Sequence, residues 1–303
     1  MYPRPQKRFP VGRKYVTIAA GFVCQDGIVL CADTEETGVG YKRRVVKLQI
    51  MPNKPPFSED EPVAIFTGSG DAAFVDEVIE EMWNGVLESG EQELSKIIKR
   101  LQYENRRYHT TIYHCYPPAT RPELLPAADL LFAVRAKDGF GLFRAYGTRF
   151  TRVRRYASIG CGAELADYIC DEAQTIWTVR AVPLAVYMLN RVKDHVPGCG
   201  GDSHIAILTR DGEAQTLSLR EILGLEEQFL TSEQITKEIL VTCANRAISD
   251  EAFDKFMRAY AKQLLAIRKK RRQQDEKLEK LVMKAVQKGL SSRSRSQKSA
   301  GQR

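Results

Sequence analysis

The hydrophobic period changes along this chain in a fixed order, and that order limits the folds that the chain can adopt. Strand-like apolar runs between residues 15 and 67 give way to helical spacing over 71–108. The two-residue period returns over 130–158, helical spacing follows over 163–196, and strands return over 204–217. Strands joined by tight hairpin turns and separated by pairs of helices are typical of antiparallel sheets, not of an alternating βα plan. We therefore predict an α+β fold, a four-layer αββα sandwich with two stacked sheets between helical layers and a C-terminal helical extension.

Composition divides the chain into four segments. Residues 1–16 are basic and rich in proline, and we expect them to form an N-terminal extension or propeptide. The globular domain is predicted to cover 17–250, and a basic helix to cover 251–290. Residues 291–303 are rich in Ser, Arg and Gln and are predicted to be disordered. The net charge is +8, but residues 265–303 carry 13 Lys and Arg against 3 Asp and Glu, so the basic character belongs to the C-terminal end.

Cysteine use and hydropathy indicate a cytoplasmic protein. The seven cysteines are odd in number and irregularly spaced, which is typical of reduced thiols rather than of a disulfide framework. No stretch approaches the roughly 18–20 apolar residues of a membrane-spanning helix, and no apolar segment of a signal peptide follows the basic N-terminus. His195, Cys199, Asp202 and His204 are close in sequence, but their spacing fits no standard metal site. We expect no membrane partner, no metal and no organic cofactor.

The first two predicted strands carry a specific spacing of polar and glycine residues. Thr17 opens the first strand, Gly21 lies four residues on, Gly27 ends an Asp-Gly turn, and Asp33 lies sixteen residues after Thr17. This spacing resembles the opening of active proteasome β-type subunits and their bacterial-type homologues, which are N-terminal-nucleophile (Ntn) hydrolases.

Three later segments extend the resemblance because they follow in the order of the family. Residues 63–73 are similar to its strand, glycine loop and first helix. Residues 159–162, Ile-Gly-Cys-Gly, are similar to its Ile-Gly-Ser-Gly turn. Residues 199–201, Cys-Gly-Gly, are similar to its Ser-Gly-Gly segment. Together the matching segments cover roughly residues 15–220.

The resemblance implies a catalytic role for several residues. Thr17 would be the nucleophile, and its own α-amino group, with a pKa near ~8 once free, would be the base. Lys47 would supply an ammonium that lowers the energy of the developing alkoxide, and Asp33 would hold that lysine in place. The backbone N–H of Gly68 would stabilise the tetrahedral oxyanion.

Three supporting residues follow from the same resemblance. Asp194 matches a supporting aspartate near the nucleophile, and Cys161 and Cys199 occupy the positions of two supporting serines. A thiol is larger than a hydroxyl and forms weaker hydrogen bonds, so the proton relay around Thr17 would differ from that of the family.

Composition alone does not separate these roles from simpler ones. Thr17 could be an ordinary strand threonine, Asp33 a capping residue, and Lys47 part of a solvated basic strand beside Lys42 and Arg43. Only the order and spacing of the four segments favour the catalytic interpretation.

The first hypothesis for function is a threonine-type endopeptidase or amidohydrolase that cleaves peptide bonds after processing at Thr17. The resemblance implies a homo-oligomeric ring with the sites facing an interior chamber. Peptides or unfolded proteins would be its substrates, and an ATP-dependent unfoldase would be a partner. It also implies that no cofactor is needed.

Two alternatives stay open. The α-amine of Thr17 is free only if the Val16–Thr17 bond is cut, and propeptides of the family that cleave themselves usually end in Gly, whereas Val16 is β-branched and stiff. An unprocessed chain would be a non-catalytic structural or assembly subunit. In a third hypothesis the basic C-terminal helix binds an acidic partner or nucleic acid. Nucleic acid is the less expected of the two, because the helix lacks interleaved aromatic residues.

Overall fold

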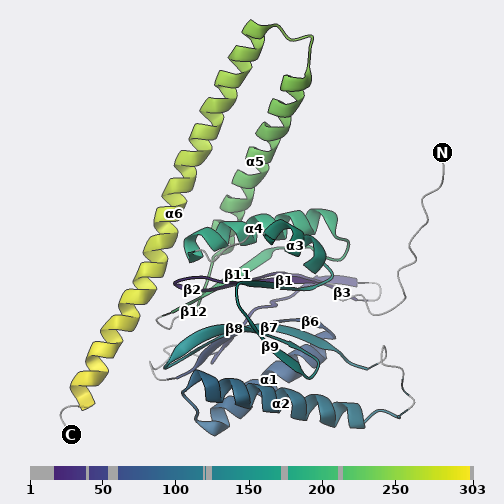
Figure 1. Ribbon diagram of the computed structural model, residues 1–303, viewed down its shortest axis with the longest axis vertical. Helices are drawn as coiled ribbons and strands as arrows, with labels where there is room; N and C mark the ends of the chain where they lie inside the picture. Colours follow the sequence, from purple (N-terminus) through teal and green to yellow (C-terminus); the bar gives the residue numbers. More distant parts are fainter. Residues whose placement is uncertain are drawn as a thin grey trace.

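The computed structural model describes a layered body from which a long helical hairpin rises (Figure 1). The residues described are 17–38, 41–53, 61–118, 120, 125–171, 177–210 and 214–300, with side chains throughout except at 37–38 and 281–300. The predicted extension 1–16 lies outside these residues, as do most of the proline-rich loop after residue 52, the turn residues 211–213, and 301–303.

The first sheet is built around the hairpin at residues 18–33. Cys24 N donates to the carbonyl of Gly27 across the turn at 2.8 Å. The strands β1 (Ile18–Val23) and β2 (Gly27–Asp33) therefore pair antiparallel, with Ala19 opposite Ala32. In spatial order its strands are β10 (Tyr156–Gly160), β1 (Ile18–Val23), β2 (Gly27–Asp33), β11 (Ser203–Thr209) and β12 (Ala214–Thr216).

The second sheet is also antiparallel, and each strand pairs with its neighbour in sequence. Its strands are β5 (Gln49–Met51), β6 (Val63–Gly70), β7 (Ala128–Ala136), β8 (Gly139–Tyr146) and β9 (Arg149–Val153). A separate two-stranded ribbon, β3 (Glu35–Gly38) with β4 (Tyr41–Arg44), links the two sheets in sequence.

Two pairs of helices cover the outer faces of the two sheets (Figure 1). α3 (Ala163–Cys170) and α4 (Thr178–His195) lie over the first sheet, and α1 (Ala72–Ser89) and α2 (Leu94–His114) lie over the second. The prediction of a mixed fold of helices and antiparallel sheets is confirmed at this level.

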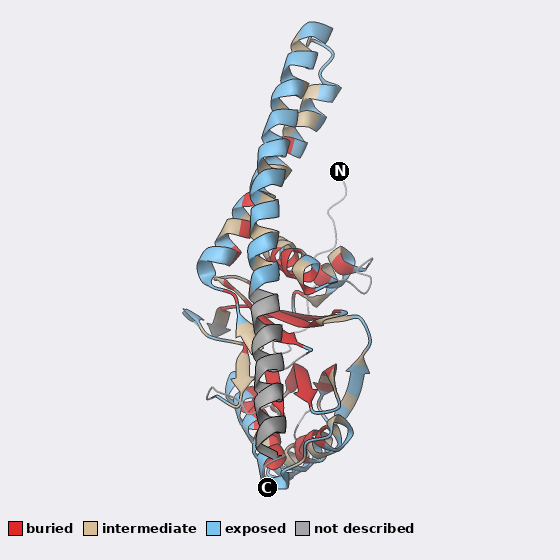
Figure 2. Ribbon diagram, turned by 90° about the vertical axis from the view of Figure 1, so that its left-hand side faces the viewer, coloured by how far each residue is buried: buried red, intermediate tan, exposed pale blue. Residues whose placement is uncertain are grey.

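The strand β2 shows how this layering buries the first sheet. All of its residues are buried, because both of its faces are covered. Figure 2 shows that the buried residues gather where the layers of the body meet. Val29 and Cys31 pack against the side chains of α3 and α4, whereas Ile28, Leu30 and Ala32 pack into the core between the sheets. Successive side chains of a strand point to opposite faces, so one apolar strand contributes to two cores.

The helical hairpin consists of α5 (Leu219–Ala244) and α6 (Asp250–Ala300). The helix α5 was not predicted from the sequence. Ser218 and Glu221 form a capping box at its start, which is the signal that could have revealed it. α6 begins where the basic helix was expected and continues to Ala300, past the expected boundary at 290. The two helices are joined by polar contacts such as that of Gln228 Nε2 with Gln274 Oε1, at 2.5 Å.

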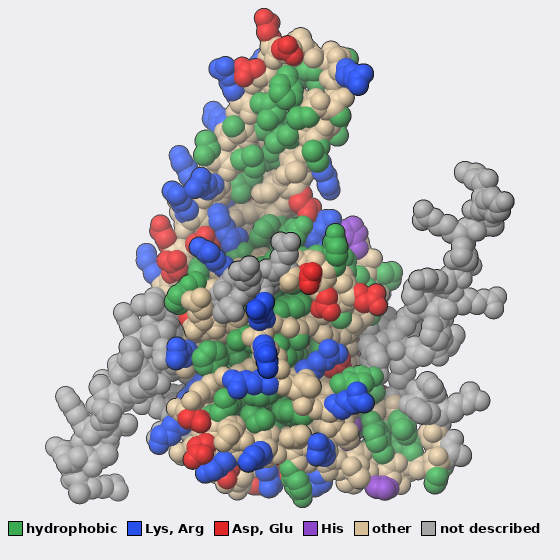
Figure 3. Space-filling view, in the orientation of Figure 1, with side chains coloured by type: hydrophobic (Ala, Val, Ile, Leu, Met, Phe, Trp, Pro, Cys, Tyr) green, Lys and Arg blue, Asp and Glu red, His purple; other side chains and the backbone are tan. Residues whose placement is uncertain are grey.

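Apolar side chains are exposed along the projecting part of the hairpin (Figure 3). They include Leu230, Leu240, Val241 and Phe256, which are 51%, 64%, 70% and 45% exposed. Among the described residues, every helix is too short or too polar to cross a membrane.

The core between the sheets should carry much of the stability of the fold. Ile65 on β6 is completely buried there. We expect Ile65→Ala to lower the free energy of unfolding by about 2–5 kcal/mol, because it removes buried methyl groups and leaves a cavity. Leu240→Ala, on the exposed part of α5, should cost less than about 0.5 kcal/mol. Urea unfolding of both variants measures the difference, and equal losses would contradict this account of the core.

Candidate active site

Thr17 and Asp33 meet because of the short hairpin between them. Antiparallel pairing sets the start of β1 beside the end of β2, where Asp33 is the last residue. Thr17 Oγ1 donates to Asp33 Oδ1 at 3.2 Å, and Ile18 N donates to the same oxygen at 3.2 Å. Gly200 N donates to Asp33 Oδ2 at 2.9 Å. Both oxygens of this fully buried carboxylate therefore have partners.

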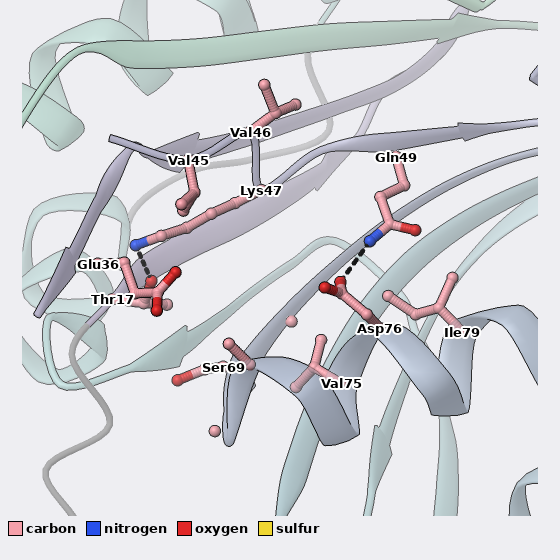
Figure 4. Close-up of a pocket in the computed structure, with 13 residues that line it drawn as sticks. Thr17, Glu36, Val45, Val46, Lys47, Gln49, Ser69, Val75, Asp76 and Ile79 are labelled. Carbon is pink, nitrogen blue, oxygen red and sulfur yellow. Dashed lines mark hydrogen bonds between the residues drawn. The ribbon is translucent and has the colours of Figure 1, made fainter. Parts of the chain in front are cut away.

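Lys47 completes the cluster from the segment between β4 and β5. Its Nζ forms hydrogen bonds with Thr17 Oγ1, with Asp33 Oδ1 at 2.6 Å and with the carbonyl of Glu35 at 2.5 Å. All three protons of the ammonium group are thus used, and the side chain is only 10% exposed. Figure 4 shows the Lys47 ammonium pointing at the Thr17 hydroxyl.

A pocket opens beside Thr17 between the two sheets (Figure 4). One wall is the end of β6, where Gly68, Ser69 and Gly70 lie. A Cβ on Gly68 would lie 2.4 Å from Val75 Cγ1, and Gly70 has a φ of +141°, so the wall needs glycine at both positions. The predicted oxyanion donor Gly68 therefore lines the same pocket as Thr17.

The rest of the pocket is apolar with acidic groups at intervals. Val45, Val46, Val75 and Ile79 provide the apolar surface, and Glu36, Gln49 and Asp76 the polar groups. Gln49 Nε2 donates to Asp76 Oδ1 at 2.7 Å, while burial raises the pKa of the Asp76 carboxyl above its usual range. None of these pocket residues was predicted from the sequence, because the helical period of α1 places Asp76 on the polar face together with Glu77 and Glu80.

The two predicted cysteines meet directly behind Thr17. Cys161 lies in the turn between β10 and α3, and Cys199 in the turn before β11, with their Sγ atoms 3.4 Å apart. Cys161 Sγ lies 3.5 Å from the carbonyl oxygen of Thr17. The hydrogen bond with Cys199 lowers the pKa of Cys161 to about 7, and the same bond raises the pKa of Cys199 far above its usual range.

The backbone of the turn between β10 and α3, which also holds Cys161, contacts the carbonyl of Thr17. Gly162 N donates to this carbonyl at 3.3 Å. Gly160 has a φ of +94°, and a Cβ there would lie 2.2 Å from Thr17 O. Glycine at position 160 is therefore required both by the backbone conformation and by the close approach of Thr17.

The structure does not bring Asp194 to this cluster. Asp194 is exposed on α4, and no hydrogen bond or ion pair joins it to the other site residues in the described part of the chain. Its neighbour Lys193 points inward instead, and its Nζ contacts Ser203 Oγ at 2.8 Å and Glu226 Oε1 at 3.0 Å. Consecutive helical residues point in different directions, so only one of the two can face the turn before β11.

The four residues that are close in sequence and could bind a metal do not form a ligand set in the structure. They are His195, Cys199, Asp202 and His204. Asp202 forms an ion pair with Arg44 at 2.9 Å, and Cys199 contacts Cys161. Within the described ranges, no group of three or more His, Cys, Asp or Glu side chains is arranged to hold a metal ion.

Comparisons with known proteins find relatives of the fold. No family model matches the chain, and no curated protein matches it. Among solved structures, Anbu (ancestral beta-subunit) from Yersinia bercovieri is similar with a TM-score of 0.60 and 13% identity, over 77% of this chain and 100% of that one. A Gly-1 mutant of Anbu from Hyphomicrobium sp. strain MC1 gives a TM-score of 0.58 and 16% identity, over 73% of this chain and 96% of that one.

These neighbours correct the family assignment made from the sequence. The Anbu proteins are proteasome-like but distinct, so the assignment of this chain to the proteasome β-type subunits is wrong. The fold is similar to that of the Anbu structures, and at such low identity the likeness extends to the fold alone. The segments that suggested the assignment are hairpins and glycine turns, which a layered fold of this kind requires for its own packing.

The paired thiols give the site a measurable titration. We expect alkylation of Cys161 by iodoacetamide to be slow below pH 7 and fast above it, because its pKa is lowered to about 7 and the thiolate is the reactive form. Asp33 and Lys47 are the charged groups that face the pair. Labelling rates measured against pH by peptide mass spectrometry give the midpoint.

Cys199→Ala provides the matched variant for this titration. It removes the hydrogen bond to Cys161 and should move the midpoint up toward the ordinary thiol value of about 8.5. A midpoint that is the same with and without Cys199 would show that the contact does not set the reactivity.

Proposed function

We propose that this chain is a threonine-type peptidase or amidohydrolase, in which Thr17 becomes an N-terminal nucleophile once the Val16–Thr17 bond is cut. The observation that carries this proposal is the convergence of Lys47 Nζ and the Asp33 carboxylate on Thr17 Oγ1 at the edge of a pocket. We extend the proposal to the architecture, a four-layer αββα sandwich with the nucleophile at the end of a central strand.

A simple structural role for the cluster explains the contacts less well. Moving an ammonium and a carboxylate out of water costs several kcal/mol for each ion, and their attraction offsets this only with good geometry and further hydrogen bonds. A threonine at the start of a strand needs neither charge for its own packing. A buried Lys–Asp pair in contact with a hydroxyl is the arrangement that stabilises an alkoxide.

The proposed reaction uses each group in a definite way. The freed α-amino group of Thr17 takes the hydroxyl proton, and Oγ1 attacks the carbonyl carbon of a peptide bond. The C–N bond then breaks, and the amine leaves with the proton from the α-amino group. Water attacks the ester on Oγ1, which releases the carboxylic acid and restores the Thr17 hydroxyl. Lys47 stabilises the negative charge on Oγ1 as the proton leaves, while Asp33 and the Glu35 carbonyl keep the ammonium in place. The backbone N–H of Gly68, on the facing wall, would receive the oxyanion, where one donor is worth about 10²–10³-fold in rate.

A non-catalytic structural subunit is the second candidate. Thr17 is only 3% exposed, and Val16 is the residue that must be released from it. If the Val16–Thr17 bond stays intact, the α-nitrogen is an amide and cannot act as a base. The cluster would then do no more than fasten the start of β1 to β2 and to the turn before β11.

Processing and activity together separate the two candidates. Intact mass and N-terminal sequencing of the native protein should give a chain that begins at Thr17. Thr17→Ala should retain residues 1–16 and abolish peptide hydrolysis, because it removes the nucleophile. Lys47→Met should lower kcat/KM by about 10²–10³-fold, since it removes the donor that stabilises the developing charge.

The control for these variants is Thr231→Ala on α5, which removes an exposed hydroxyl bonded to the carbonyl of Glu227. It should be processed and should cleave peptides like the native chain. A native protein that keeps residues 1–16, or hydrolysis that survives in Thr17→Ala, would rule out the proposed mechanism and favour the structural role.

The pocket also predicts a preference among substrates. Its apolar walls fit the stem of a long side chain, and Asp76 places a carboxylate beside it. We expect higher kcat/KM for peptides with Lys or Arg before the cut bond than for peptides with Asp or Glu. Asp76→Asn should reduce this ratio about two- to fivefold, the effect of a partly exposed ion pair worth roughly 0.5–1 kcal/mol.

Glu80→Gln is the matched control for this measurement. It removes one negative charge from the exposed surface of α1 and does not line the pocket. An equal change of the ratio in the two variants would mean that the overall charge, not the pocket, decides the preference.

A further inference from the structure

We propose that Cys161 and Cys199 form an oxidisable dithiol, a modification site for hydroperoxides at which a reversible disulfide controls the Thr17 centre. The modification stands independently of enzymatic activity, and only its consequence for catalysis rests on the proposed function.

The two sulfur atoms are already in contact. They lie 3.4 Å apart, and a disulfide bond of about 2.05 Å requires them to approach by about 1.3 Å. Both thiols lie in turns rich in glycine: Cys161 between Gly160 and Gly162, and Cys199 between Gly198 and Gly200. Gly160 and Gly198 have φ values of +94° and +96°, so the backbone beside each thiol uses conformations open mainly to glycine. Closing the gap between the sulfur atoms therefore requires the two turns to shift toward each other.

The two thiols differ in a way that suits sequential oxidation. Cys161 is exposed and Cys199 is buried, so a small peroxide reaches Cys161 first. The hydrogen bond with Cys199 lowers the pKa of Cys161 to about 7, and this favours the thiolate of Cys161 near neutral pH. In contrast, burial raises the pKa of Cys24, Cys31 and Cys170 and keeps those thiols protonated. The arrangement pairs an accessible, reactive thiol with a protected thiol in contact with it.

The chemistry balances with a hydroperoxide as the oxidant. The Cys161 thiolate attacks the terminal oxygen of the peroxide, the O–O bond breaks, and the leaving oxygen takes a proton and departs as water or an alcohol. Cys161 is then a sulfenic acid. Cys199 attacks its sulfur, the S–O bond breaks, and water leaves with the Cys199 proton. Two thiols are oxidised by two electrons to one disulfide, and one peroxide is reduced.

The disulfide would act on residues that hold the nucleophile. Cys161 Sγ lies 3.5 Å from Thr17 O, and the next residue, Gly162, donates its N–H to the same oxygen at 3.3 Å. On the other side, Gly200, which follows Cys199, donates to Asp33 Oδ2 at 2.9 Å. Drawing the two turns together therefore moves one support of Thr17 and one support of Asp33 at once. A disulfide also removes the thiol proton that Cys161 can donate to the carbonyl oxygen of Thr17.

The first experiment tests the modification on the full native chain. The protein is treated with a small excess of hydrogen peroxide, its free thiols are blocked, and its peptides are compared before and after reduction. We expect a disulfide-linked pair of peptides containing Cys161 and Cys199, lost on adding dithiothreitol. Cys199→Ser should leave Cys161 as a sulfenic acid that dimedone labels.

Cys115→Ser/Cys243→Ser is the control, because it removes two further exposed thiols far from the cluster in sequence. The Cys161–Cys199 bond should form in it at an unchanged rate. Cross-linking through Cys115 or Cys243 in place of this bond, or oxidation of Cys161 to a sulfinic acid without a cross-link, would overturn the proposal.

The second experiment tests control of the site. Peptide hydrolysis should fall with the time course of the cross-link and return with dithiothreitol, whereas Cys161→Ser/Cys199→Ser should be insensitive to peroxide. Hydrolysis that is unaffected by a complete cross-link would overturn the control of Thr17. Formation of the cross-link in a chain that hydrolyses nothing, even when fully reduced, would support the dithiol and overturn the proposed enzymatic function instead.

Discussion

The ion pair between Lys47 and Asp33 is the interaction on which the arrangement around Thr17 depends. Asp33 is completely buried and Lys47 nearly so. Burying two such charges is costly unless each has partners for its remaining hydrogen-bonding groups. Here Asp33 accepts from Ile18 N and Gly200 N, and Lys47 also donates to the Glu35 carbonyl. The pair thus links the start of β1, the end of β2 and the turn before β11, and Thr17 lies where these segments meet.

The stacking of the two sheets turns this cluster into a site with a pocket. The Thr17 side belongs to the first sheet, whereas Gly68 and Ser69 belong to β6 of the second, and α1 adds Val75 and Asp76. The apolar core between the sheets sets their relative position. The glycines at the end of β6 then allow α1 to approach closely, because any Cβ at Gly68 would meet Val75. The packing of the core between the sheets therefore also determines the shape of the pocket.

The paired thiols give this site a chemistry that hydroxyl groups would lack. Serines at these positions could hydrogen-bond but could not be oxidised to a covalent link. The cysteines keep a weaker hydrogen bond and bring a titration near neutral pH. If the proposed disulfide forms, their position between the supports of Thr17 and of Asp33 would connect the redox state of the surroundings with the geometry around Thr17.

Part of this architecture could be read from the sequence. The change of hydrophobic period predicted the coarse order of strand and helix regions up to β12, because the period reports which faces of each element are buried. It did not predict the ribbon of β3 and β4, whose residues are largely polar. The contact of Thr17 with Asp33 was also predictable, since both residues belong to one hairpin whose register follows from its short turn. The helix α5 was missed because its apolar residues are partly exposed on a projecting hairpin, where burial imposes no strict period.

Other features were decided by the tertiary structure alone. The inward direction of Lys193 instead of Asp194 depends on the rotation of α4 about its axis. The contact of Cys161 with Cys199 and the pocket residues Gln49 and Asp76 depend on how separate layers pack together. The family could not be read from hairpins and glycine turns, because different families with one layered fold need the same turns. By itself, the sequence determined the local pairing of strands through short turns and alternating burial. The packing of distant segments decided which side chains share the site, because contacts between layers depend on shape and distance that no local pattern records.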